Sequence, residues 1–318
     1  MGFDALLGNE TLKQRLAASF KSGRFSHCYL ITGAEGAGKK TLANLLAAAM
    51  QCTAADKPCL QCSQCRKALH GNHPDIITVD EADRATIPVK RIREITAELY
   101  IRPNEGNRKI YYFPRAAALR TEAQNALLKC IEEPPAYGTF LFLCEHPEQM
   151  LPTVQSRCVE LRLSPLEDSV LLSALRRRFP DRDASLLSAA AVRSGGYLGQ
   201  AIAAIEDGDS LLPQSESFVQ AYCGADTAAL LRLLVSMEKL KREQLRPIFA
   251  QWIVLLEGAL RIHASLPAAW PACKRIAAVR TSASLLAAIN AVEQAQKYLE
   301  SNVGAAHICG ALAVRLQG

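Results

Sequence analysis

Four cysteines that lie close together in the chain could bind a metal ion. They are Cys52, Cys59, Cys62 and Cys65. Two C-x-x-C steps that share Cys62, with one more distant cysteine before them, supply enough thiolates for a closed tetrahedral zinc site. An iron–sulfur run would need another cysteine and then a proline at the positions of Leu69 and His70. We therefore predict one structural Zn²⁺ at about residues 52–70, against the alternatives of four free thiols or of His70 or His73 replacing a cysteine.

A glycine-rich segment, GAEGAGKKT at residues 33–41, could bind phosphate. It matches the G-x-x-x-x-G-K part of the phosphate-loop motif, in which backbone N–H groups surround phosphate at a helix N-terminus. The next position should be Ser or Thr to ligate Mg²⁺ but is Lys40, and Thr41 lies about 100° further round the helix. The predicted vestigial phosphate loop consists of Gly33, Gly36, Gly38, Lys39 and Thr41. Whether it still binds nucleotide is left open by these residues.

Both sets of residues need a strand and helix framework to position them. Residues 27–32 predict a strand that enters the glycine-rich loop, and an Ala/Leu-rich helix follows to about residue 50. Further on, residues 110–113 and 139–143 have the length and the β-branched or aromatic content of buried parallel strands. Residues 121–132 between them have helical spacing, with Thr121 as the expected N-cap. The sequence therefore predicts an α/β domain with a parallel sheet.

The central stretch also carries a resemblance to a known family. The run TEAQNALLKCIEEPP at residues 121–135, then a strand and Ser156-Arg157-Cys158, resembles the clamp-loader branch of the AAA+ ATPases, especially the bacterial delta-prime subunits. The resemblance is strong over the N-terminal half and weak beyond it. It implies an AAA+ (RecA-like) phosphate-loop domain with a zinc module, a small helical lid, and an all-α C-terminal collar that holds five subunits in an open ring.

The resemblance also shows which chemical groups this chain has replaced. Family members that hydrolyse ATP end the strand at residue 113 with an Asp-Glu pair, whereas this chain has Pro114 and Arg115. A proline cannot ligate a metal, and an arginine stays protonated and cannot act as a general base. Cys144 and Gln200 likewise stand where active members have groups that sense nucleotide. We therefore expect no ATP hydrolysis by this chain.

Arg157 has two possible roles. By itself, an arginine after a short helix is usually a surface residue or a salt-bridge partner. In the clamp-loader pattern, the same arginine is the finger that reaches the γ-phosphate bound by the neighbouring subunit. Guanidinium suits this role because its donors form a rigid fork and its charge is permanent.

The chain is expected to have three domains. The boundaries predicted are 1–164 for the AAA+ domain, 165–208 for the lid and 209–318 for the collar, with a linker at residues 207–210. The last part is almost wholly helical by pattern, with helices expected at 216–222, 227–239, 242–264, 283–300 and 303–316. Trp252 and Trp270 are expected in its core or at an interface.

Composition narrows the class of protein. The chain has 318 residues, 49% of them hydrophobic, and a net charge of +6, which is too small for a dedicated nucleic-acid binder. No apolar stretch is long enough to span a bilayer, and the N-terminal residues do not resemble a signal peptide. We therefore expect a cytoplasmic protein with no membrane partner, in which eleven cysteines do not form a disulfide framework.

Three functions remain to be compared. The first is a non-hydrolysing structural subunit of the bacterial DNA polymerase III clamp loader, which supplies Arg157 in trans and helps to load the sliding clamp onto primed DNA. The resemblance gives it delta and gamma/tau subunits as partners in a hetero-pentamer. The second is an ATP-hydrolysing loader subunit or repair AAA+ ATPase, which Lys40, Pro114 and Arg115 oppose. The third is a zinc-dependent DNA-binding protein, although the sequence lacks interleaved aromatic and basic residues.

Overall fold

The computed structural model describes residues 2–81, 84–206, 211–266, 268, 270–301 and 303–316. Its contacts define two units, one made of Met1–Leu171 with Tyr197–Gly199 and the other of Leu172–Gly196 with Gln200–Gly318. The linker expected at residues 207–210 lies outside the described residues. The division into three domains stays a prediction.

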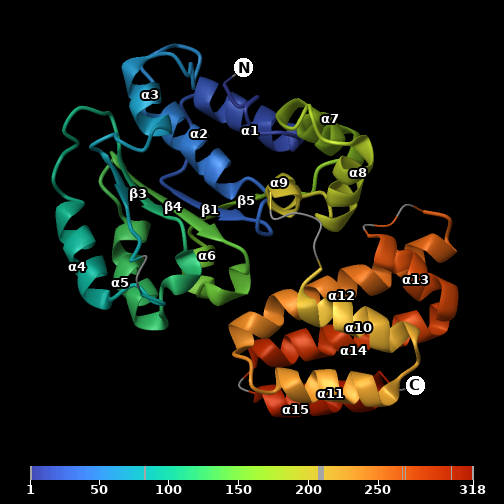
Figure 1. Ribbon diagram of the computed structural model, residues 1–318. Coiled ribbons are helices and arrows are strands. Elements are labelled where there is room, and N and C mark those ends of the chain that lie inside the picture. The colour runs from blue at the N-terminus through green and yellow to red at the C-terminus, as the bar shows by residue number, and fades with distance from the viewer. Residues whose placement is uncertain are drawn as a thin grey trace. The chain divides into compact units, whose positions relative to one another are not determined.

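A five-stranded parallel sheet forms the centre of the first unit (Figure 1). Its strands are β1 (Cys28–Thr32), β2 (Ile76–Thr78), β3 (Lys109–Phe113), β4 (Gly138–Cys144) and β5 (Val159–Arg162). Their order across the sheet is β2-β3-β4-β1-β5. All residues of β1, β3 and β4 are buried, as expected for parallel strands covered on both faces. The predicted α/β class with a parallel sheet is confirmed.

Helices cover both faces of the sheet (Figure 1). On one face, α1 (Glu10–Lys21) and α2 (Lys39–Gln51) pack on alternate strand residues such as Tyr29 and Leu141. On the other face, α4 (Val89–Glu98), α5 (Thr121–Glu132) and α6 (Pro152–Gln155) pack on the intervening residues. The remaining short elements are α3 (Ser63–Leu69), η1 (Ala116–Ala118) and η2 (Pro147–Gln149). This alternation directs successive strand side chains into two separate cores.

The start of α5 differs from the expectation. The predicted N-cap, Thr121, is the first helical residue, and the N-cap is Arg120 without a side-chain hydrogen bond. Buried Gln124 instead anchors this end of the helix: its amide donates to the carbonyls of Leu119 and Gln149, at 2.9 and 3.1 Å. A Gln side chain that reaches neighbouring loops therefore performs the anchoring expected of a threonine hydroxyl.

The second unit is entirely helical in the residues described. Its helices are α7 (Asp168–Arg178), α8 (Ala184–Arg193), α9 (Leu198–Glu206), α10 (Pro213–Cys223), α11 (Thr227–Met237), α12 (Arg242–His263), α13 (Pro271–Val279), α14 (Ser282–Glu300) and α15 (Ala305–Arg315). The first residues of α7 and of α9 belong to the first unit. The five helices predicted after residue 211 are confirmed within a few residues, and α13 was missed. Among the described residues no single helix is long and apolar enough to cross a membrane, although α13 and α14 pass that test as a pair bent by 120°.

Trp252 should contribute strongly to the stability of the helical unit. Its side chain is fully buried and stacks on Phe218, with ring centroids 4.2 Å apart, and it also contacts Phe249. Trp252→Ala should lower the free energy of unfolding by about 3–5 kcal/mol, because the lost burial leaves a cavity. Urea unfolding followed by circular dichroism measures this change. Leu286→Ala, at a half-exposed site, should change it by less than about 0.5 kcal/mol, and equal effects of the two variants would contradict the core assignment.

Candidate functional site

The glycines of the phosphate loop adopt conformations that side chains rarely tolerate. Gly33, Gly36 and Gly38 have φ angles of 150°, 76° and 96°, and Gly38 directly precedes α2. These positive angles favour glycine, which has no Cβ. The loop therefore has the strand-to-helix setting predicted for a phosphate cradle.

Lys39 is fully engaged by groups of its own unit. Its ammonium donates to the carbonyls of Gly33 and Ala34, at 2.7 and 2.8 Å, and to a carboxylate oxygen of Glu145 at 3.2 Å. A lysine ammonium has three donors, so these acceptors use all of them. A phosphate could bind Lys39 only by displacing acceptors that include one negative charge.

The beginning of α2 offers no metal ligand at the expected place. Lys40 and Thr41 are both exposed in the first turn of the helix. The phosphate loop also contacts the start of α9, where the N–H of Gly199 donates to the carbonyl of Gly36 at 3.0 Å. A Cβ added to Gly199 would lie 2.6 Å from Gly36 Cα, closer than atoms can approach. The segment Tyr197–Gly199 therefore rests directly on the phosphate loop within the first unit.

The end of β3 presents a cation where hydrolysis would need a carboxylate. Arg115 donates through Nε to Asp80 at 2.8 Å, and its Nη2 lies 2.6 Å from the same carboxylate oxygen. Nη2 also donates to the carbonyl of Glu81 at 2.7 Å. A cavity of about 340 Å³ at this edge is lined by Lys39, Pro114, Arg115, Cys144 and Glu145 among others. The Asp80 carboxylate is thus held in an ion pair with the arginine.

Cys144 has its own partner at the end of β4. The thiol is buried and donates to the carbonyl of His146 at 3.1 Å. Burial raises the pKa of Cys144, so the group stays a neutral thiol. It is poorly suited to sensing a phosphate, as the sequence indicated.

The structure brings the four predicted metal ligands together. The Sγ atoms of Cys52, Cys59, Cys62 and Cys65 all lie within 4.8 Å of one another. Four sulfurs at 2.3 Å from a tetrahedral Zn²⁺ are about 3.8 Å apart, so the cluster fits such an ion with little movement. The two histidines considered as alternatives bond elsewhere: His70 Nδ1 to the Arg66 carbonyl, and His73 Nδ1 to the Asp75 N–H. These four thiols could hold a metal ion.

Backbone N–H groups point at the sulfurs of the cluster. Cys59 N–H donates to Cys52, Cys62 N–H to Cys59, and Cys65 N–H to Cys62, at 3.3–3.4 Å. Burial disfavours the thiolate at Cys62, but the N–H groups of Cys65 and Thr53, together with the neighbouring thiols, outweigh it and lower the pKa of this thiol to about 6. At Cys52 and Cys65 burial dominates and raises the pKa. The donors around Cys62 favour the thiolate form that a metal requires.

Arg157 lies on the surface of the first unit. Its side chain is 36% exposed, forms an ion pair with Glu132 of α5, and donates through Nη1 to the Thr153 carbonyl at 2.7 Å. Glu132 is the last residue of α5, and Thr153 lies in α6, four residues before Arg157. The guanidinium is therefore held in a defined direction, and it is accessible from outside.

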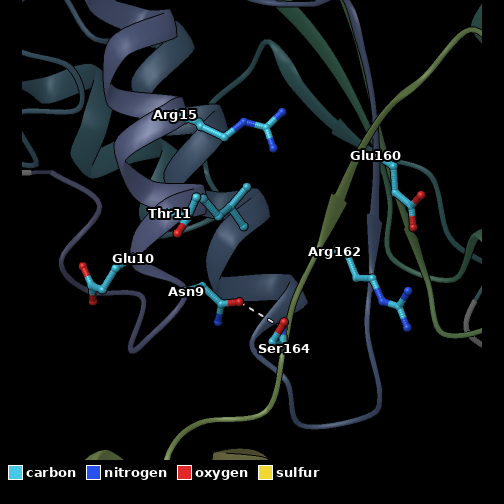
Figure 2. A pocket seen from close by; sticks show the side chains of 8 residues that line it. Asn9, Glu10, Thr11, Arg15, Glu160, Arg162 and Ser164 are labelled. Atoms are coloured by element: carbon cyan, nitrogen blue, oxygen red, sulfur yellow. Dashed lines mark hydrogen bonds between the residues drawn. The ribbon is translucent and has the colours of Figure 1, made fainter.

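A second cavity lies beside the edge strand β5 (Figure 2). Its volume is about 370 Å³, and Arg15 projects from α1 toward the strand. Asn9 accepts a hydrogen bond from the Ser164 N–H at 2.9 Å, and Glu160 accepts one from the Thr32 hydroxyl at 2.8 Å. The lining mixes positive and negative charges without a cysteine or histidine. The Asn9 contact fastens the start of α1 to the segment after β5, and the Glu160 contact joins β5 to the end of β1.

Three acidic residues at these sites were missed by sequence reasoning. They are Glu145, which pairs with Lys39; Asp80, which pairs with Arg115; and Glu132, which pairs with Arg157. Only Glu145 had a usable signal, because it directly follows β4, whose end lies beside that of β1 in the sheet.

Comparison with known proteins gives a family match that lies within the first unit. The family model described as "DNA polymerase III, delta subunit" matches residues 8–167, half of the chain. The delta' subunit of Pseudomonas aeruginosa DNA polymerase III is 35% identical over 54% of this chain and 53% of its own length. The tau/gamma subunit of Haemophilus influenzae is 31% identical over 61% of this chain and 29% of its own length. This chain thus spans about half or less of these relatives.

Among solved structures, a DNA polymerase III gamma subunit-related protein from Thermotoga maritima is similar at 15% identity, with a TM-score of 0.43. That likeness covers 96% of this chain and 98% of the other. We assign the chain to a family from its sequence matches, together with the phosphate loop and the parallel sheet that are typical of an AAA+ protein. The chain belongs to the DNA polymerase III clamp-loader family whose model is described as "DNA polymerase III, delta subunit".

Proposed function

We propose that this chain is a non-hydrolysing structural subunit of the bacterial DNA polymerase III clamp loader, in the role of delta prime. The observation that carries the proposal is the ion pair between Arg115 and Asp80 at the end of β3. Hydrolysis needs a carboxylate there to hold the water shell of Mg²⁺ and a base to polarise the attacking water. A proline and a permanently charged guanidinium provide neither.

The phosphate loop supports the same proposal. Glu145 places a carboxylate against Lys39, where a bound nucleotide would place phosphate oxygens. A nucleotide must therefore break this ion pair and also do without a Ser or Thr ligand for Mg²⁺ at position 40. On this proposal Gly33, Gly36, Gly38, Lys39 and Thr41 form a structural loop rather than a catalytic one.

Arg157 would act on a nucleotide bound by another subunit. Its guanidinium is exposed and already directed by Glu132 and the Thr153 carbonyl, so little side-chain freedom is lost when it meets a phosphate. Exchange of the Glu132 carboxylate for γ-phosphate oxygens keeps the charge pairing. The proposed role is an arginine finger supplied in trans.

The proposed partners follow from the resemblance to clamp loaders and from the names of the relatives. Delta, together with gamma/tau subunits, would complete a hetero-pentamer that loads the sliding clamp onto primed-template DNA, and the work would take place in the cytoplasm. Zn²⁺ is the ion proposed for Cys52, Cys59, Cys62 and Cys65, because all four donors are thiols and no position is left for a substrate. Its role would be structural.

ATP turnover by the purified chain tests the loss of hydrolysis. With Mg²⁺ and ATP we expect no phosphate release above that of Lys39→Ala, because the metal ligand and the base are both missing. The alternative, an ATP-hydrolysing subunit or repair ATPase, predicts turnover that Lys39→Ala abolishes, and that result would overturn the proposal.

Purification of the chain from native cells, with its partners identified by mass, should recover other loader subunits. Recovery of the chain alone would contradict the structural role.

A further inference from the structure

Two cysteines outside the four-cysteine cluster are in direct contact. The Sγ atoms of Cys28 and Cys158 lie 2.9 Å apart. Strands β1 and β5 are parallel, and their first registered pair is Tyr29 with Val159, so the two cysteines stand side by side one residue earlier. Neighbouring strands are about 4.8 Å apart, inside the range of Cα separations that disulfides span. A covalent bond would bring the sulfurs about 0.9 Å closer, so it needs little backbone movement.

The two thiols differ in their access to solvent. Cys28 is fully buried in the core between the sheet and helices α4 and α5, and Cys158 is partly exposed directly before the edge strand β5. Burial raises the pKa of Cys28 well above its ordinary value, and the adjacent Cys158 thiol adds to the effect. A reagent in solution therefore meets Cys158 first, and Cys28 follows as the second thiol.

We propose that Cys28 and Cys158 form a redox-modifiable dithiol that hydrogen peroxide converts into an intramolecular disulfide. The Cys158 sulfur attacks one peroxide oxygen, forming an S–O bond and breaking the O–O bond, and a water molecule leaves. The Cys28 sulfur then attacks the Cys158 sulfur, and its proton leaves with the departing hydroxide as a second water. Two thiols and one hydrogen peroxide thus give one disulfide and two waters.

The position of Cys158 gives the modification a consequence. Cys158 directly follows Arg157, and its N–H donates to the Gln155 carbonyl at 3.0 Å within the same turn. A disulfide fixes this turn to the buried strand β1. Any effect on ATP hydrolysis by a neighbour rests on the proposed function of Arg157, whereas the dithiol itself does not.

Peptide mapping of the full-length chain tests the proposal. After hydrogen peroxide and alkylation of the remaining thiols, trypsin should release residues 25–39 linked to residues 158–162, each with one cysteine. The four cluster cysteines share the peptide 41–66, because Lys57 precedes Pro58, and Cys130 shares the peptide 130–157 with Cys144. The linked pair should form before any other pair and should disappear with dithiothreitol. Linkage elsewhere first, or no link at all, would overturn the proposal.

Variants separate the two steps. Cys28→Ala should stop the reaction at a sulfenic acid on Cys158 that dimedone traps, and Cys158→Ser should leave Cys28 reduced. Cys223→Ser, at another partly exposed thiol, should leave the link unchanged. Stable sulfenic acid at Cys158 in the unaltered chain would show that Cys28 does not react and would sink the dithiol. In a reconstituted loader, the disulfide should form more slowly if a neighbouring subunit covers the turn that carries Arg157 and Cys158. An unchanged rate in the loader would contradict the proposed contact of Arg157 with a neighbour. Formation of the disulfide in the isolated chain would still support the dithiol.

Discussion

Cys62→Ser should release the bound metal and unfold the segment between α2 and β2, while the parallel sheet stays folded. The fully buried apolar cluster of this segment consists of Ala48, Cys52, Cys65 and Ala68, and the segment contributes only half-buried residues such as Leu60 and Leu69 to the larger core beside α2. So small a core cannot hold a loop of this length. Structural zinc sites in isolated zinc-finger peptides supply about 10–16 kcal/mol of apparent binding free energy, and loss of one thiolate removes a large part of it.

Metal analysis and limited proteolysis measure this effect. The unaltered chain should carry about one Zn²⁺ and resist trypsin, whereas Cys62→Ser should carry almost none and be cleaved at Arg66 and Lys67. Cys223→Ser, a cysteine substitution in the helical unit, should keep both metal and resistance. A metal-free native protein with four alkylatable thiols in the cluster, or a Cys62→Ser protein that keeps its metal, would contradict the zinc assignment.

The sequence predicted the structure best where a single physical cause, such as burial or metal binding, determines which residues are present. Strands β3 and β4 are buried on both faces, so continuous apolar runs predicted them within one residue of their observed ends. The cysteine cluster could also be predicted from the sequence, because metal ligands in a small module must be close in sequence. The loss of the acidic pair at residues 114 and 115 needed only the identities of two side chains.

The rest depended on contacts that spacing does not encode. Lys39 and Glu145 are 106 positions apart, and Arg157 meets Glu132 only because α5 and α6 pack together. The edge strand β5 buries only Leu161, so it lacks the alternation that marks a strand. Helix α13 has nine residues beginning with Pro271, too few for a clear helical period.

Arg157→Ala should leave loader assembly intact and lower DNA-stimulated ATP hydrolysis by the complex. An arginine supplied in trans raises the rate of hydrolysis at the site that receives it by about 10³–10⁵-fold. Loss of Arg157 should therefore almost stop hydrolysis at that one site, and the total rate of the complex should fall by the fraction that this site contributes. The folded chain should tolerate the change, because the ion pair with Glu132 is partly exposed and contributes at most about 1 kcal/mol. Arg157→Lys should recover little activity, since an ammonium lacks the planar fork of donors.

A matched control distinguishes a finger from a general positive charge at the interface. Arg162 is an exposed arginine on β5, five residues after Arg157, and the structure places it beside the cavity at the sheet edge. Arg162→Ala should leave hydrolysis near the unaltered rate, because only a guanidinium that contacts the transferred phosphoryl group stabilises the transition state. Gel filtration of both complexes checks assembly, and phosphate release measures the rate. Equal losses in the two variants would assign the effect to surface charge, and full activity of an assembled Arg157→Ala complex would remove the trans role altogether.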